Sequence, residues 1–354
     1  MSRNQKIRTL MAGCALILAA AVILAVSGIF GGIGYTYGNA EKYTSGETEL
    51  KETIRNLEVG WIDGAVKIEY HDGNTVLLRE TSRKTIGEDM KMRWWLDGDT
   101  LRIRYAKSGL RLGTGLDKEL TVTLPKGIAL SEVSLEATSG DLYASGLKAE
   151  TLKLETTSGT IRAEAETASL RTGSSSGGQE LTVNGTAGEI RLDSTSGAIA
   201  LSGESAGKLE ANSTSGGIAV AMSGKADTLS VHTTSGGIAA DVNEAGKLTA
   251  ESTSGGIGLR LQSAGEIHAT CTSGTVSVAA GKLDVLKVDS TSGDVTAALP
   301  ETPGFTASVH TTSGKIGHTA MLTASGSEYS CGDGSARVEI HTTSGDVRLD
   351  AWQE

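Results

Sequence analysis

The sequence is short of aromatic residues, of cysteine and of positive charge, and each shortage excludes a class of protein. Only 4% of its 354 residues are aromatic, whereas a compact globular core takes much of its buried area from aromatic rings. Three cysteines do not form the dense, even set of a disulfide framework. With 47 glycines, only 3 prolines and 38% hydrophobic residues, the composition favours a thin core repeated many times.

Acidic residues outnumber basic ones, 42 against 32, which gives a net charge of -10. Nucleic acid and anionic lipid are therefore excluded as main partners, because both need a basic patch. The sequence also contains no P-loop, no zinc-ligand spacing and no nucleophile motif. We expect no enzyme activity and no cofactor.

The first 34 residues predict a membrane anchor. Arg3, Lys6 and Arg8 precede a run of 24 uncharged residues from Leu10 to Ile33, and about 20 apolar residues cross a bilayer as a helix. The positive-inside rule makes residues 1–9 a cytoplasmic stub, residues 10–34 a single transmembrane helix and the remainder extracytoplasmic. This predicts a single-pass protein of the cell membrane.

Two other interpretations of the N-terminus stay open. A signal peptide could end at Gly38-Asn39-Ala40, but the apolar run is longer than the usual 7–15 residues. A lipoprotein could be modified at Cys14, but most of the apolar run follows that cysteine. An uncleaved anchor is favoured, followed by residues 35–50 as a small, polar tether.

Residues 51–130 alternate with period two between turn signals, which predicts successive antiparallel hairpins. The turns are Asp63-Gly64, the segment "HDGN" and Asp97-Gly98-Asp99. Trp94 falls on the core face. Trp95 falls on the opposite face, where it packs on the start of the repeats or meets a sugar or a membrane interface.

From residue 131 to the end, the sequence repeats a Thr-Ser-Gly triplet. Serine precedes the glycine every time, and the intervals are 18–21 residues except for a last one of 31. The twelve extra residues predict a loop near 318–335. We call the last residue of each triplet the triplet glycine: Gly140, Gly159, Gly177, Gly197, Gly216, Gly236, Gly255, Gly274, Gly293, Gly314 and Gly345.

Apolar residues flank every triplet at fixed distances. The residue seven before the glycine is always apolar, and the residue two after it is apolar except at Gln179. Alternation with period two around these positions predicts one strand on each side of the triplet. Residues 131–354 are therefore expected to form an all-β, right-handed parallel β-solenoid of about eleven coils, with Trp352 covering its end.

The triplet is expected to form a corner of each coil. Glycine there either takes a positive φ or sits where a Cβ would strike the next coil, and the hydroxyls bond the backbone at the bend. Cys271 stands three before its glycine, where most coils have serine or threonine, so it should act as a serine-sized filler. Gly236→Val should damage the solenoid, whereas Gly207→Ser should not. Pairing of Cys271 with Cys331 is left open.

The segments "NLEVGWIDGAVKIEYHDG", "LTVTLPKG" and "TTSGGI" resemble one family. It is the bacterial β-strand-repeat "putative adhesin" family, domain of unknown function 4097. The resemblance covers roughly residues 50–350 and implies a membrane-anchored or surface protein of bacteria. It implies no catalytic residues.

One cluster could hold a divalent metal. Asp289, His310 and His341 share the position four before the glycine in three coils, and stacked positions lie about 5 Å apart. A ladder of solvated polar side chains is the simpler interpretation, so we expect no metal site.

Three functions remain. The leading hypothesis is a non-enzymatic envelope protein that presents a rigid polar surface to another protein or to a cell-wall glycan. The second is a structural rod that associates with itself through unpaired strand edges. The third is a glycan-active enzyme that uses acids on the outer face of the coils.

Overall fold

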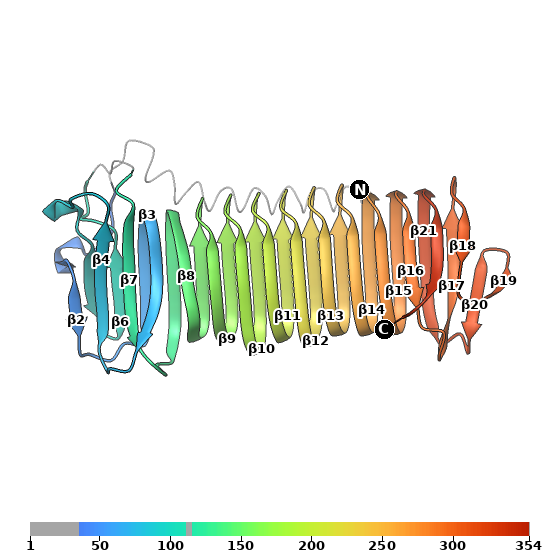
Figure 1. The fold of residues 1–354 in the computed structure, drawn as a ribbon, viewed down its shortest axis with the longest axis horizontal. Coiled ribbons are helices and arrows are strands. Elements are labelled where there is room, and N and C mark those ends of the chain that lie inside the picture. The colour runs from blue at the N-terminus through green and yellow to red at the C-terminus, as the bar shows by residue number, and fades with distance from the viewer. Residues whose placement is uncertain (1–34, 111–114, 354) are drawn as a thin grey trace. The chain divides into compact units, whose positions relative to one another are not determined.

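The computed structural model describes residues 35–110 and 115–353, and it is built almost entirely from β-strands (Figure 1). Contacts divide the chain into two compact units, Met1–Thr182 and Val183–Glu354, and the cut falls inside strand β10. The domain boundary expected near residue 130 stays a prediction.

The elements are η1 (Ala40–Lys42), β1 (Thr44–Ser45), β2 (Thr48–Leu50), β3 (Asn56–His71), β4 (Val76–Ser82), η2 (Glu88–Met90), β5 (Arg93–Asp97), β6 (Thr100–Arg104), β7 (Lys118–Pro125), β8 (Leu130–Thr156), β9 (Ile161–Ser174), β10 (Gln179–Ser194), β11 (Ile199–Ser213), β12 (Ile218–Thr233), β13 (Ile238–Ser252), β14 (Ile257–Ser273), β15 (Val276–Ser292), β16 (Val295–Leu299), β17 (Gly304–Thr311), β18 (Ile316–His318), β19 (Thr323–Ser325), β20 (Glu328–Gly332), β21 (Ala336–Ser344) and β22 (Val347–Ala351).

The expected fold class needs a correction in its helical part. Within residues 35–110 and 115–353 the only helices are the short 3-10 turns η1 and η2, and no helix is long and apolar enough to cross a membrane. The reason is the period-two alternation of these residues, which favours strands. The expected stub at 1–9 and the expected span 10–34 both lie outside the described residues.

The parallel stacking expected of the repeats is confirmed. From β12 to β15, each strand pairs in parallel with the next, and equivalent repeat positions face one another. The apolar positions two after and seven before the triplet glycine stack in two columns. The columns contain Ile218, Ile238, Ile257 and Val276, and Leu229, Leu248, Ile267 and Leu286.

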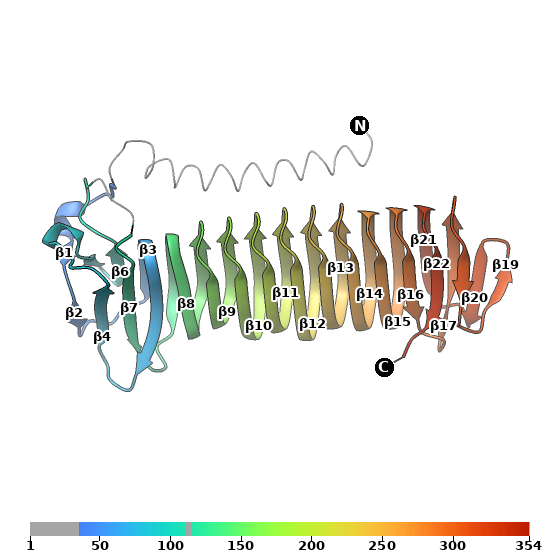
Figure 2. The same ribbon diagram turned by 45° about the horizontal axis from the view of Figure 1, so that its top comes forward.

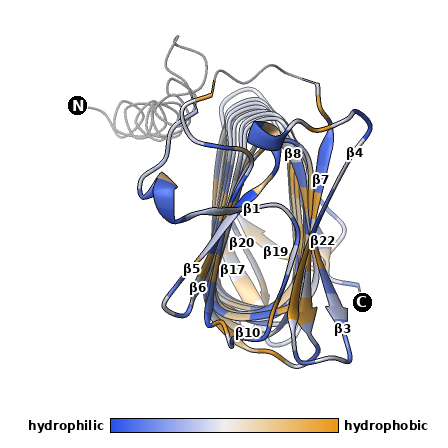
Figure 3. Cartoon of the chain, turned by 90° about the vertical axis from the view of Figure 1, so that its left-hand side faces the viewer, coloured by the Kyte–Doolittle hydropathy of each residue, from blue (hydrophilic) through white to orange (hydrophobic). Residues whose placement is uncertain are grey.

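Each coil encloses a thin apolar core. The residues of both columns are at most 3% exposed, while their neighbours along the strand point outward. Figure 3 shows the flattened coils end-on, with the hydropathy of each residue coloured along the strands. Gln179, the one polar residue of the first column, is also buried, and its side-chain oxygen accepts a hydrogen bond from the Thr172 hydroxyl. That bond satisfies a polar group that would be costly to bury alone.

The triplet glycines are required by close approach of successive coils. A Cβ on Gly236 would lie 2.1 Å from the carbonyl oxygen of Gly216, and one on Gly255 would lie 1.9 Å from that of Gly236. The buried Thr233 hydroxyl accepts from the Gly236 N–H at 3.1 Å and donates to the Gly216 carbonyl at 3.3 Å. The hydroxyl thus joins its own corner to the corner of the preceding coil.

A second close approach at glycine recurs in several coils, and it was not predicted from the triplet. Nine residues before the triplet glycine, an Ala-Gly pair recurs, as in Ala206-Gly207 and Ala245-Gly246. A Cβ on Gly207 would lie 2.8 Å from the carbonyl oxygen of Gly188, and one on Gly246 would lie 2.5 Å from that of Asp227. The expectation that Gly207→Ser is harmless is therefore wrong, because the added Cβ would press on backbone.

Cys271 behaves as the serine-sized filler that its position predicts. It is buried between Ser252 and Ser290 of the neighbouring strands, and its thiol donates to the Gly255 carbonyl at 3.5 Å, as Ser252 does to Gly236. Burial raises the pKa of the Cys271 thiol. Cys271 and Cys331 are both free, so the pairing left open by the sequence does not form.

Replacing Cys271 by serine should therefore change the free energy of unfolding by no more than about 0.5 kcal/mol. Serine keeps both the size of the side chain and the donor for the Gly255 carbonyl. Urea unfolding followed by circular dichroism measures the difference. A loss of about 2 kcal/mol or more would show that the sulfur itself is needed.

The N-terminal segment of unit 1 contains a coil without the triplet. Strand β3 is continuous through Asp63-Gly64, where a hairpin was expected, and it stacks in parallel on β8 with Gly64 opposite Gly140. The hairpin prediction fails here because Gly64, at φ +99, bends one strand inward at a corner and does not reverse the chain. The expected hairpin around "HDGN" is also interrupted, since β7 lies between β3 and β4 and pairs with both.

Antiparallel strands complete this end of unit 1. The hairpin at Asp97-Gly98-Asp99 is confirmed, because β5 and β6 pair antiparallel around it. Residues 35–50, expected as a tether, instead supply β1, which pairs with β5, and β2, which pairs with β4. Tyr43 contacts the ring of Trp95 edge-on at 5.6 Å, and the Lys42 ammonium lies 4.7 Å from it. Trp95 is thus covered by this segment.

At the other end of the chain, the order of coils in unit 2 departs from the order in sequence. Strand β21 pairs with β15 on one side and with β17 on the other, so the last coil in sequence lies between its two predecessors. The long last interval makes this possible. It forms the hairpin β19–β20, which pairs antiparallel with the outer side of β17, before the chain returns inward (Figure 2).

Trp352 does not cover the end of the solenoid as expected. Because β22 lies between β16 and β18, the tail leaves from inside the stack. The Trp352 ring packs against Gly281, and the Arg260 guanidinium lies 5.0 Å from the ring. The hairpin β19–β20 covers the edge of β17 instead.

Candidate binding site on unit 1

The three candidate metal ligands, Asp289, His310 and His341, lie at equivalent positions of adjacent strands. Their order follows from the position of β21 between β15 and β17. His341 lies between the other two, opposite Asp289 on one side and His310 on the other. The rings of His310 and His341 are tilted, with centroids 6.4 Å apart. Among the residues that the structure describes, no group of three acids, histidines or cysteines could hold a metal ion.

The acids on the outer face of the coils are engaged with cations. Lys153 contacts Glu136 at 2.6 Å and Glu155 at 3.1 Å, and Arg191 contacts Asp193 at 2.8 Å. Each pair links neighbouring positions on one strand or on adjacent coils. The pairs of Lys153 belong to a solvated ladder, in which each pair contributes little to stability. The Asp193 side chain is only 4% exposed, so its pair with Arg191 is not of this exposed kind.

A shallow hollow on the outer face of unit 1 has a different character. Its volume is about 370 Å³, and we call it the Tyr143 hollow after its one aromatic residue. The buried side chains of Ile68, Ala144 and Ala163 lie beneath it. Its rim is polar and consists of Lys67, Glu69, Tyr143, Ser145, Arg162, Glu164, Glu180 and Thr182.

The parallel register places these rim residues in two columns. Lys67 stands opposite Tyr143, and Tyr143 stands opposite Arg162, each three residues after its corner glycine. Glu69, Ser145 and Glu164 follow two residues later on the same strands and point to the same side. One column therefore holds the aromatic ring between two cations, and the other holds mainly oxygen acceptors.

Tyr143 is held in place at its hydroxyl and along its ring. The hydroxyl donates to the Asp141 carboxylate at 3.0 Å and accepts from the Arg162 guanidinium at 3.4 Å. The same guanidinium lies 5.8 Å from the ring centre. Partial burial, followed by the Asp141 carboxylate, raises the pKa of the Tyr143 hydroxyl, so it stays a neutral donor. A ring fixed in this way loses little freedom when a ligand packs on it.

The hollow was not predicted from the sequence, although the sequence contains one feature that indicates it. Tyr143 is the only aromatic residue between Tyr105 and Phe305, and it falls on an outward position three after a triplet glycine. The columns beside it depend on the pairing of β8 with β3. Because the Gly64 coil lacks the triplet, the register of that pairing could not be assigned from the repeat.

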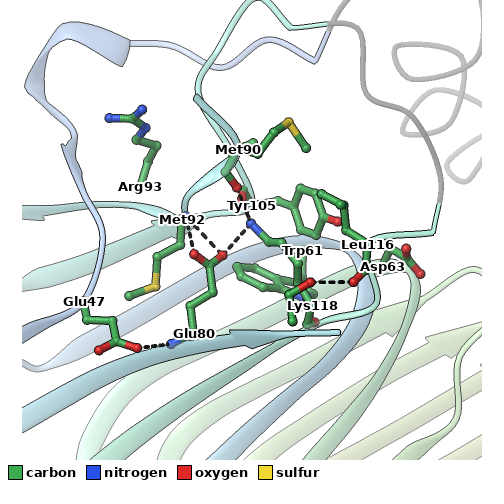
Figure 4. Close-up of polar contacts among 12 residues, drawn as sticks. Glu47, Trp61, Asp63, Glu80, Met90, Met92, Arg93, Tyr105, Leu116 and Lys118 are labelled. Carbon is green, nitrogen blue, oxygen red and sulfur yellow. Dashed lines mark hydrogen bonds and ion pairs between the residues drawn. The ribbon is translucent and has the colours of Figure 1, made fainter. Parts of the chain in front are cut away.

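A second group of polar residues in unit 1 is buried and structural. Lys118 stands opposite Gly64, and its fully buried ammonium contacts Glu80 at 2.5 Å and donates to the Met90 carbonyl at 2.6 Å (Figure 4). Its side chain lies against the rings of Tyr105 and Trp61, at 4.0 and 5.0 Å. Burial lowers the pKa of Lys118. This cluster fills the corner of the first coil, where the triplet is missing.

Comparison with known proteins identifies the family. No curated protein matches the chain significantly. Among solved structures, a "putative cell adhesion protein" from Clostridium sporogenes is 11% identical with a TM-score of 0.22, over 87% of this chain and 100% of that one. A "putative adhesin" from Bacteroides fragilis is 11% identical with a TM-score of 0.25, over 86% of this chain and 95% of that one. The family model described as Toastrack DUF4097 matches residues 42–226 and 223–350, and the chain therefore belongs to this family.

Proposed function

We propose that the protein is a non-enzymatic, adhesin-like binding protein that recognises a polymer of the cell envelope through the Tyr143 hollow. The observation that carries the proposal is the outward, fixed ring of Tyr143 at the rim of a hollow with polar walls. Aromatic rings with a polar tip are favoured at binding surfaces, because they offer a large contact area at a small cost in conformational entropy. The location in the envelope stays a prediction from the sequence.

A stack of short coils suits this role. Each strand is fixed on both sides by its neighbours, so the outer side chains form columns with a spacing of about 4.8 Å. A polymer that lies along a column meets similar groups at regular intervals. Self-association through strand edges has less support, because the antiparallel hairpin β19–β20 covers β17, and short or covered edges resist strand addition.

Binding to purified cell-wall material tests the proposal. We expect Tyr143→Ala to weaken the apparent affinity for the wall material at least about tenfold. The reason is that a well-packed aromatic contact contributes about 2 kcal/mol to binding. Tyr143→Phe keeps the ring and should retain most of the binding. Ser277→Ala, at the equivalent outward position of β15, is the matched control and should bind as the unchanged protein does.

The readout is co-sedimentation with the wall material over a range of protein concentrations. Thermal unfolding of each variant confirms that the fold is intact. Equal retention of Tyr143→Ala and the unchanged protein would contradict the proposal.

A further inference from the structure

The last coil, formed by β21 and β22, is inserted between two coils that are in register with each other. β21 lies between β15 and β17 (Figure 1), and its Val338 faces Leu286 on one side and Ala307 on the other. β22 lies in the same way between β16 and β18. We call the space between these two coils the slot. Because both walls of the slot face the same residues, they could pair with each other directly if the last coil left.

The corner of the last coil uses hydrogen bonds that the two walls of the slot could also form with each other. The Asp346 N–H donates to the Asp294 carboxylate at 2.9 Å, and the Asp346 carboxylate accepts from the Lys315 N–H at 2.8 Å. Without the last coil, the Lys315 N–H would stand opposite the Asp294 carboxylate, in the place of the Asp346 N–H. Closing the slot therefore keeps the strands on both sides paired, and only the contacts of one coil are lost.

A released coil would be unfavourable in water, because its inward side chains are apolar. Val338, Ile340, Val347 and Leu349 are at most 1% exposed in the stack. Exposed apolar side chains and unpaired strand edges both promote association with another chain. The site that accepts this coil best is the slot of a second copy, since it offers the same apolar columns and the same Asp294 carboxylate.

Two features control the release of the last coil. The connection from β20 to β21 is a turn in which Gly332 and Gly334 have positive φ values of +60 and +72, and a glycine turn is a suitable hinge. After β22, the Trp352 N–H donates to the Leu299 carbonyl at 2.8 Å, and the Trp352 ring packs against Gly281. Trp352 therefore retains the last coil in its own chain.

From this arrangement we infer that the protein joins a second copy of itself by exchanging the last coil. In the joined pair, each copy places its β21 and β22 in the slot of the other copy, where they make the contacts described above. Exchange of an identical element is a low-cost route to a dimer, because no new contact has to be built. The balance between single and joined copies depends on protein concentration. The inference is independent of the proposed function, since it involves no residue of the Tyr143 hollow.

Disulfide trapping in the full chain tests the inference. Ser292 and Ser344 are exposed and face each other on β15 and β21. Stacked positions are about 4.8 Å apart, a Cα separation that a disulfide can bridge. In Ser292→Cys/Ser344→Cys, the disulfide closes within one chain if the coil is in its own slot, and it links two chains if the coil is exchanged. Ser273→Cys/Ser292→Cys is the matched control, because it joins β14 to β15, which the exchange does not separate.

The reduced variants are incubated at high protein concentration in urea below the unfolding transition, then diluted, oxidised and separated on a non-reducing gel. We expect at least about fivefold more linked dimer for Ser292→Cys/Ser344→Cys than for the control. Adding Trp352→Ala should raise the dimer at least about threefold further, since it removes the ring that retains the coil. Oxidation before the incubation should prevent the dimer.

Both double variants keep the three native cysteines, so a dimer linked through those would appear equally in each. Circular dichroism of each variant confirms that the coils are folded. Equal amounts of dimer in Ser292→Cys/Ser344→Cys and in the control would overturn the inference. A disulfide closed only within single chains, even with Trp352→Ala, would show that the last coil stays in its own slot and would overturn it as well.

Discussion

Gly236→Ala is expected to lower the free energy of unfolding by at least about 3 kcal/mol, although it adds a single methyl group. That methyl carbon would lie 2.1 Å from the Gly216 carbonyl oxygen, 2.5 Å from its carbon and 2.8 Å from the Gly217 nitrogen. All three are backbone atoms of the preceding coil, which cannot rotate away as a flexible side chain can. Overpacking alone costs up to about 3 kcal/mol. The coils must also separate, which breaks the hydrogen bonds of the corner and adds about 1 kcal/mol for each bond lost.

The next residue supplies a matched control. Gly237 is exposed, and a Cβ there would meet only the Gly256 carbonyl oxygen, at 3.6 Å, which is an ordinary contact. Gly237→Ala should therefore change stability by no more than about 0.5 kcal/mol. Thermal unfolding followed by circular dichroism should show a fall of roughly 6–12 °C in the midpoint for Gly236→Ala, with little change for Gly237→Ala. Similar midpoints for the two variants would refute the steric role of the triplet glycine.

The regular part of the fold could be predicted because one physical rule repeats in it. Each apolar column recurs with the triplet, so a single register fixes every coil from β11 to β15. The buried position of Cys271 follows from the same register. The second close approach could also have been found, because the Ala-Gly pair recurs nine residues before the triplet glycine.

The ends could not be predicted, because there the partners of a strand are not its neighbours in sequence. β7 separates β3 from β4, and β21 separates β15 from β17, although the local patterns favour hairpins and simple succession. Gly64 is not part of a Thr-Ser-Gly triplet, so its pairing with Gly140 could not be predicted from the repeat and is known only from the structure. The Tyr143 hollow depends on that pairing, which is why an outward tyrosine was not recognised as part of a site.

Glu80→Ala is expected to destabilise the protein by about 3–5 kcal/mol, because it leaves the Lys118 ammonium buried without a counter-ion. Both side chains of this pair are nearly inaccessible, at 0% and 3% exposure. Glu80 also accepts a hydrogen bond from the Met92 backbone nitrogen at 3.0 Å, which connects the start of β5 to this corner. The variant therefore removes the acceptor of the Met92 N–H and, at the same time, leaves the Lys118 ammonium without its counter-ion.

An exposed pair in the same unit provides the comparison. Lys107 and Asp89 are 3.0 Å apart, but both are more than half exposed, so Asp89→Ala should cost less than about 1 kcal/mol. Urea unfolding measures both variants. A cost below about 1 kcal/mol for Glu80→Ala would mean that water reaches Lys118 and that the corner is not closed.

A double-mutant cycle separates the charge from the packing. Lys118→Met/Glu80→Leu removes both charges and keeps apolar volume against Trp61 and Tyr105, so it should be more stable than the sum of the two single changes predicts, by at least about 2 kcal/mol. It should not regain full stability, since the Met90 carbonyl and the Met92 N–H lose their partners. Strict additivity would show that Lys118 and Glu80 act independently, and that the corner of the first coil is held by its aromatic rings alone.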